Sequence, residues 1–134
     1  MPTGVVKGPD GALYMSQLTG FPFLPESASV YRIDPRTGAR SVYASGFTNA
    51  IDLDFGRDGT LYVLEMDNDS LLGEETDGAL FAVHRRGGTA RRVKLPDDTL
   101  THPGGVAVGR KGDLYVSNRS TEAGTGEVLK IDLG

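Results

Sequence analysis

A short phrase occurs three times in the chain, and this repetition constrains the fold more than any other feature. The copies are DGALYMS at 10–16, DGTLYVL at 58–64 and KGDLYVS at 111–117. Their turn glycines, Gly11, Gly59 and Gly112, lie 48 and 53 residues apart. A period of about 40–50 residues that carries four short strands is typical of β-propeller blades.

Each repeat divides into strands in the same way. A tight turn (PDG, RDG or RKG) separates the first two strands of each repeat, and its glycine supplies the positive φ that such a turn needs. First strands are expected at 4–8, 52–56 and 105–109, second strands at 12–16, 60–64 and 113–117, third strands at 29–34, 79–84 and 127–132, and fourth strands at 40–44 and 91–95. No helical periodicity competes with this pattern.

The predicted fold class is therefore all-β, a β-propeller fragment of about three four-stranded blades. The blades span 3–48, 49–100 and 101–134, and the last lacks its outer strand. Natural propellers close with roughly four to eight blades, so an open stack of three leaves two apolar blade faces in water. We expect the chain to pair with itself, most simply as a homodimer that forms a six-bladed ring. A trimer, a larger open assembly, exchanged strands and a fragment that never closes remain alternatives.

Composition excludes several classes of function. The formal net charge of −4 gives no reason to expect a nucleic acid as partner. No run of about 18 apolar residues is present, so no membrane span is expected. The absence of cysteine excludes disulfides and thiolate metal sites. Residues 1–15 lack the charged and apolar regions of a signal peptide, so the chain as given is expected to carry no export signal.

Long loops mark one end of the predicted blades as the functional face. The first-to-second and third-to-fourth turns are minimal, whereas the remaining connections, which share the opposite end, are long and varied. Gln17, Glu65 and Asn118 occupy one equivalent position at this end and are candidates for a polar ring, although strand ends are often polar because they are wet. Asn49 and His102 precede inner strands near the channel mouth, where His102 is either a turn residue or a ligand.

Two further groups of side chains are candidates for this face or the axis. Asp52 and Asp54 lie on an inner strand, where a carboxylate must be hydrogen-bonded or paired. Their role is either structural, with backbone amides or an arginine of the next blade as partners, or catalytic. The aromatic residues Phe21, Phe23 and Phe47 either cap a pocket or cover the blade edges beneath their loops.

An acidic loop, DNDSLLGEETDG, begins like a calcium loop but departs from the EF-hand pattern. Leu71 and Leu72 stand where an oxygen ligand and the required glycine belong, and Gly78 stands where the closing glutamate belongs. Looser calcium binding remains open for the five acidic residues of the loop, Asp67, Asp69, Glu74, Glu75 and Asp77.

The repeat motifs resemble known propeller families. HPGGVAVGRKGDLYVSN is similar to the NHL-type repeat, and TGFPF, VYRIDPRTG, SGFTNAIDLDFGRDGTLYVLEM and SNRSTEAGTGEVLKI together resemble the C-terminal half of the ScyD/ScyE family. That resemblance implies half of a six-bladed bacterial propeller, from a parent family that is commonly secreted or periplasmic. It also implies that the missing outer strand comes from an N-terminal segment of the parent.

A more distant resemblance is to the gluconolactonase, strictosidine synthase and paraoxonase group, six-bladed propellers with an axial divalent metal. Their ligands are Glu, Asn and Asp near the starts of inner strands. In register, this chain has Thr3, Ile51 and Gly104, none of them a good ligand, and Asn49 lies about two residues too early. We therefore expect a self-assembling scaffold or binding module without a catalytic constellation.

The alternative function is a metal-dependent lactonase-like hydrolase. An axial divalent cation such as calcium, held by Asn49, Glu65 and Asn118, would polarise a carbonyl group.

Overall fold

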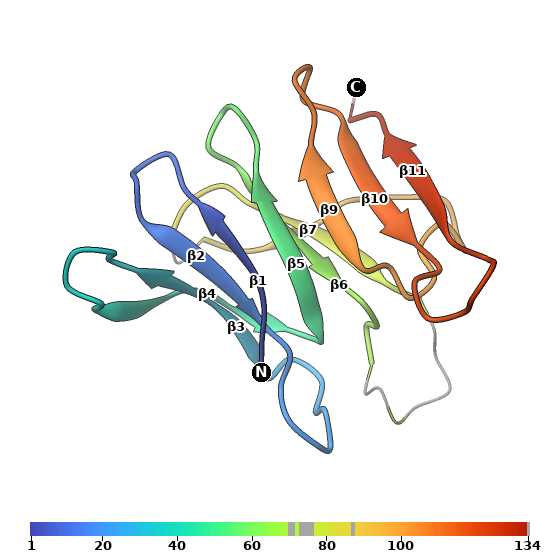
Figure 1. Cartoon of the computed structure of the whole chain (residues 1–134), viewed down its shortest axis with the longest axis horizontal. Helices are drawn as coiled ribbons and strands as arrows, with labels where there is room; N and C mark the ends of the chain where they lie inside the picture. Colours follow the sequence, from blue (N-terminus) through green and yellow to red (C-terminus); the bar gives the residue numbers. More distant parts are fainter. Residues whose placement is uncertain (70–71, 73–76, 87, 134) are drawn as a thin grey trace.

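The structure is a computed structural model that describes residues 1–69, 72, 77–86 and 88–133. These residues form eleven strands in three antiparallel sheets that stand side by side (Figure 1), so the predicted all-β propeller class is confirmed. Within them, no helix is long and apolar enough to cross a membrane.

Each sheet is a meander in which consecutive strands pair. The first contains β1 (Pro2–Lys7), β2 (Leu13–Gln17), β3 (Ala28–Ile33) and β4 (Arg40–Phe47). The second contains β5 (Ala50–Phe55), β6 (Leu61–Glu65), β7 (Ala79–Val83) and β8 (Arg91–Arg92). The third contains β9 (Gly105–Val108), β10 (Leu114–Asn118) and β11 (Glu127–Ile131). The first strands of the three sheets, β1, β5 and β9, lie next to one another (Figure 1).

The repeated turns have the backbone that their glycines predict. Gly11, Gly59 and Gly112 have φ values of 83°, 87° and 89°. Each accepts this conformation because it has no Cβ, and each donates its N–H to the glycine carbonyl three residues earlier. The three copies of the phrase therefore fold in the same way.

The fourth strands differ most from the prediction. β4 extends to Phe47 instead of ending at residue 44, whereas β8 covers only Arg91–Arg92 of the expected 91–95. Val93 still donates its N–H to the Leu80 carbonyl at 2.8 Å, but Pro96 has no N–H with which to continue a ladder. The described part of the third sheet has three strands, and the sequence predicts that this blade lacks its outer strand.

Two apolar clusters fill the spaces between the sheets. The first cluster lies between the first and second sheets and is rich in aromatic rings. Tyr14 meets Tyr43 and Phe55 edge-on at centroid distances of 5.0 and 4.7 Å, and Phe47 meets Phe81 at 5.9 Å. The second cluster, between the second and third sheets, is mainly aliphatic and has as its fully buried members Leu64, Leu80, Leu114 and Val116.

Candidate functional site

The long loops bring four polar side chains together beside β5 and β9. We call them the loop-face cluster: Asn49, Asp67, His102 and Thr121. Asn49 and His102 hold equivalent places before β5 and β9, and both have a left-handed backbone, with φ values of 49° and 42°. This conformation is uncommon outside glycine and costs energy, so the surrounding contacts must hold both residues in place.

Asn49 is fully buried in this cluster. Its side-chain amide donates to the carbonyl oxygens of Asp67, at 3.4 Å, and Asp69, at 2.5 Å. Its Oδ1 has no hydrogen-bond partner among the described residues. A buried oxygen without a partner is costly, and such exceptions often mark a place where a ligand or water belongs.

His102 connects two loops through its ring nitrogens. Nε2 lies 3.6 Å from Oδ2 of Asp67, and Nδ1 lies 3.1 Å from Oγ1 of Thr121. The Asp67 side chain is almost inaccessible, whereas the His102 side chain keeps 24% of its exposure. Burial raises the pKa of Asp67, and the charge and hydrogen bond of His102 oppose that rise. A ligand that approaches this face would therefore meet the exposed side of the His102 ring.

The candidates for a polar ring, Gln17, Glu65 and Asn118, hold equivalent positions in the three sheets. Each ends the second strand of its sheet, and each uses its side-chain oxygen on a backbone N–H nearby. Oε2 of Glu65 accepts from Thr48 at 2.7 Å, and Oδ1 of Asn118 accepts from Thr101 at 2.9 Å. Oε1 of Gln17 accepts from Ser29 at 3.2 Å.

The shared position therefore has a local role. Glu65 and Asn118 are buried and not solvated. Glu65 binds the connection before β5 to the end of β6, and Asn118 binds the connection before β9 to the end of β10. Asn118 adds bonds from Nδ2 to the Thr99 carbonyl and to Glu127. Its oxygen and amide thus bind the connection that precedes β9 and the Glu127 side chain on β11.

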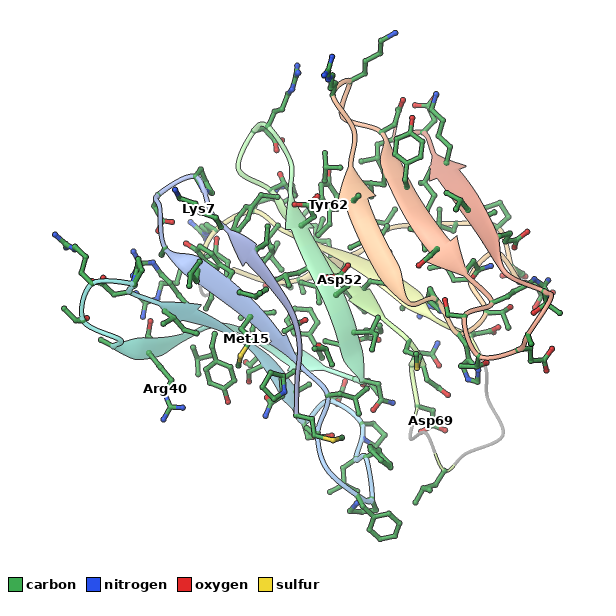
Figure 2. All side chains as sticks on the ribbon, in the orientation of Figure 1. Lys7, Met15, Arg40, Asp52, Tyr62 and Asp69 are labelled. Atoms are coloured by element: carbon green, nitrogen blue, oxygen red, sulfur yellow. The ribbon has the colours of Figure 1, made fainter. Side chains whose placement is uncertain are left out.

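Asp52 and Asp54 join the second sheet to the third. Asp52, at the centre of Figure 2, accepts from the Val106 amide at 2.9 Å, and Asp54 accepts from the Val108 amide at 2.7 Å. Burial raises the pKa of Asp52, and the Val106 N–H lowers it to a smaller degree. Of the two predicted roles, the geometry is that of the structural one, with backbone amides of β9 as the partners.

The predicted aromatic group is divided between core and surface. Phe47 is 1% exposed and belongs to the first cluster, so it does not cap a pocket at the surface. Phe21 is 78% exposed and meets Phe23 edge-on at 6.3 Å on the loop after β2. Of the three predicted rings, those of Phe21 and Phe23 are therefore the ones that a ligand could reach from outside.

The calcium hypothesis is only partly testable, because Glu74 and Glu75 lie outside the described residues. Asp69 donates its N–H to Oδ1 of Asp67 at 2.9 Å, and Asp77 forms an isolated bridge with Thr101. Across the described ranges, no group of three His, Asp or Glu side chains is arranged to hold a metal ion.

A groove that was not predicted lies between the outer strands of the first and second sheets. Its volume is about 840 Å³, and Glu65 reaches it from β6. Burial raises the pKa of Glu65 to about 7, and the Thr48 N–H opposes the rise to a smaller degree. The sequence offers no periodic signal for this groove, because its walls come from two repeats whose outer strands are the least alike.

The fold is similar to solved propeller proteins. A streptogramin B lyase structure matches with a TM-score of 0.58 and 17% identity, over 98% of this chain and 40% of that one. A structure described as that of a gluconolactonase matches with a TM-score of 0.62 and 18% identity, over 97% of this chain and 49% of that one.

The chain thus spans less than half the length of each of these two structures. A scan against protein families finds no match. No curated protein matches the sequence either. At these identities the similarity shows the fold alone: this chain is a partial β-propeller.

Proposed function

We propose that this chain is a half-propeller of the ScyD/ScyE type that closes a six-bladed ring with a second copy and presents its loop-face cluster for binding. One observation carries the proposal: each end sheet has an exposed apolar surface. In the third sheet it is the surface that, in the first two sheets, packs on the following sheet, and in the first sheet it is the surface on the opposite side. The motif resemblance to ScyD/ScyE proteins supports the same interpretation.

A repeated tyrosine marks the uncovered surface of the third sheet. Tyr14 packs on Phe55 of the following sheet, and Tyr62 packs into the second cluster, against the third sheet. The equivalent Tyr115 has no following sheet and is 40% exposed. Val128, opposite Ser117 on β11, is 72% exposed. Both side chains are apolar surface that burial in a ring would stabilise.

The first sheet offers a receiving surface at the other end of the stack. A groove of about 430 Å³ is lined there by Met15, Tyr31 and Val42, with Arg40 at its side. Figure 2 shows Met15 and Arg40 on the first sheet, away from β5. Two copies related by a two-fold axis would bring the third sheet of each against the first sheet of the other, which closes both junctions at once.

Light scattering on a sizing column, over a dilution series, tests this proposal. We expect the mass of two chains at high concentration, and a shift towards one chain for Tyr115→Arg. Arg57→Glu, a charge change in the turn after β5, is the matched control and should keep the mass of the parent. A parent protein that stays monomeric at every concentration would overturn the proposed ring.

The residues do not fit the alternative hydrolase with an axial ion. Of its three predicted ligands, Asn118 uses its side-chain oxygen on a backbone amide, and Glu65 uses one of its two carboxylate oxygens in the same way. Among the described residues, no group of three His, Asp or Glu side chains is arranged to hold a metal ion. The open Asn49 oxygen instead supports a binding role for the loop-face cluster.

A further inference from the structure

The groove between the first and second sheets has the size and walls of a small-molecule site. Its volume of about 840 Å³ lies within the range of about 300–1,000 Å³ that is usual for such sites. Tyr43 and the half-buried Phe81 supply aromatic surface, and the buried Phe47 packs edge-on against Phe81. The groove lies within one chain and does not include Asn49 or His102 of the loop-face cluster.

Glu65 places a buried carboxyl group at this groove. The residue is 3% exposed, and its Oε2 accepts the Thr48 N–H. Throughout the described residues, no arginine, lysine or histidine forms an ion pair with it. The charge of Arg92 attracts the Glu65 carboxylate and lowers its pKa, but burial outweighs this attraction. A cation that enters the groove would therefore supply the close ion pair that Glu65 lacks.

The remaining charged groups of the lining favour a cation as well. Glu26 and Asp69 add two acidic groups, and Arg92 is the only basic one. With Glu65 ionised, three acids and one base give the lining a formal charge of −2. Aromatic faces attract cations through their quadrupoles, so the walls and the charge select the same kind of ligand.

We propose that this groove binds a small organic cation with an apolar body, whose ammonium group lies against Glu65 and whose body contacts Tyr43 and Phe81. Glu65 would provide the charge recognition, and the rings would provide both contact area and cation–π attraction. This site is separate from the loop-face cluster and does not depend on ring closure.

Nuclear magnetic resonance titration with benzyltrimethylammonium chloride, whose charge is fixed, tests the proposal. The amide of Thr48 is the reporter because it donates to Glu65. We expect a saturable shift of this amide, and an affinity about tenfold lower or worse in Glu65→Gln, which keeps an acceptor for Thr48 but loses the charge. Glu122→Gln, the same change on an exposed loop, should bind as the parent does.

A ligand series on the unaltered protein gives an independent test, which decides the question even if Glu65→Gln does not fold. At one fixed pH and ionic strength, neutral benzyl alcohol should bind more weakly than the cation, and benzoate should not shift the Thr48 amide. Benzoate binding as tightly as the cation would overturn the proposal, since Arg92 would then dominate recognition. An unmoved Thr48 amide, or equal affinity in Glu65→Gln, would also overturn it.

Discussion

The second sheet meets its two neighbours through different chemistry. Towards the first sheet the contact is made by interlocked aromatic rings, and the hydroxyl of Thr3 on β1 donates to the Ala50 carbonyl at 2.8 Å. Towards the third sheet the packing is aliphatic, and the carboxylates of Asp52 and Asp54 accept backbone amides of β9. The sheets are thus joined by the packing of aromatic rings at the first junction and by hydrogen bonds from backbone amides to carboxylates at the second.

The two junctions differ because the inner strands β1 and β5 carry different side chains. At the two equivalent positions β1 has Gly4 and Val6, whereas β5 has Asp52 and Asp54. Only the carboxylates can satisfy amides of the next inner strand, whose N–H groups otherwise face the junction. Position along the propeller therefore does not fix the chemistry of a junction, and the two junctions should fail under different perturbations.

The largest effect is expected from Phe47→Ala, which breaks the aromatic junction. Removing a buried phenylalanine leaves a cavity, and the free energy of unfolding should fall by about 3–5 kcal/mol. Urea denaturation measures this loss. Phe21→Ala, at a ring that is 78% exposed, is the control and should change stability little. Equal losses for the two variants would mean that the first junction does not depend on Phe47.

A smaller effect, dependent on pH, is expected at the same junction from Glu65. Its pKa is raised from 4.5 to about 7 in the folded protein, so between these values the folded protein retains a proton that the unfolded chain releases. The free energy of unfolding should therefore fall as pH rises through this window, by on the order of 2–3 kcal/mol in total, and stay level above it.

Glu65→Gln should lack this dependence, so its stability relative to the parent protein should increase between pH 4.5 and about 7. Urea denaturation at a series of pH values makes the comparison, with Glu122→Gln as the control that should follow the parent. A constant difference between Glu65→Gln and the parent across the window would contradict the assignment.

The smallest effect is expected from Asp54→Ala at the second junction. Loss of the acceptor leaves the Val108 N–H without a partner, which should cost about 1–2 kcal/mol. Hydrogen exchange should quicken at Val108 and leave the amides of β2 and β3 unchanged. Asp54→Asn keeps an acceptor and should cost less. If the two variants were equally destabilised, the bond between Asp54 and Val108 would not be what holds β9.

Most of the fold could be predicted because it depends on local rules that recur. Alternating apolar residues give the second strands, and a glycine with positive φ separates them from the first strands in all three repeats. The weaker prediction was the strand at 91–95, since Lys94, Leu95 and Pro96 form no ladder beyond Val93. Outer strands have fewer partners, so their length depends on tertiary contacts that a sequence pattern does not contain.

The candidate site could be predicted only in part. The place of Asn49 and His102 before inner strands marks them in the sequence, whereas the pattern around Asp67 indicates only a calcium loop and no pattern marks Thr121. The cluster joins residues from four connections, and no spacing rule relates them. The polar ring stays a prediction, and the sequence did not indicate that Glu65 and Asn118 accept backbone amides of the preceding connections, because that depends on how closely those connections approach.

The repeated tyrosine gives the stack of sheets a direction. Tyr14 and Tyr62 each lie on the surface of one sheet that meets the following sheet, and Tyr115 points the same way at the end of the described stack. Each of the first two sheets therefore meets the next one through the same tyrosine position. In the proposed ring, an in-frame duplication of the gene would join the two copies in one chain, after which each half would be free to diverge.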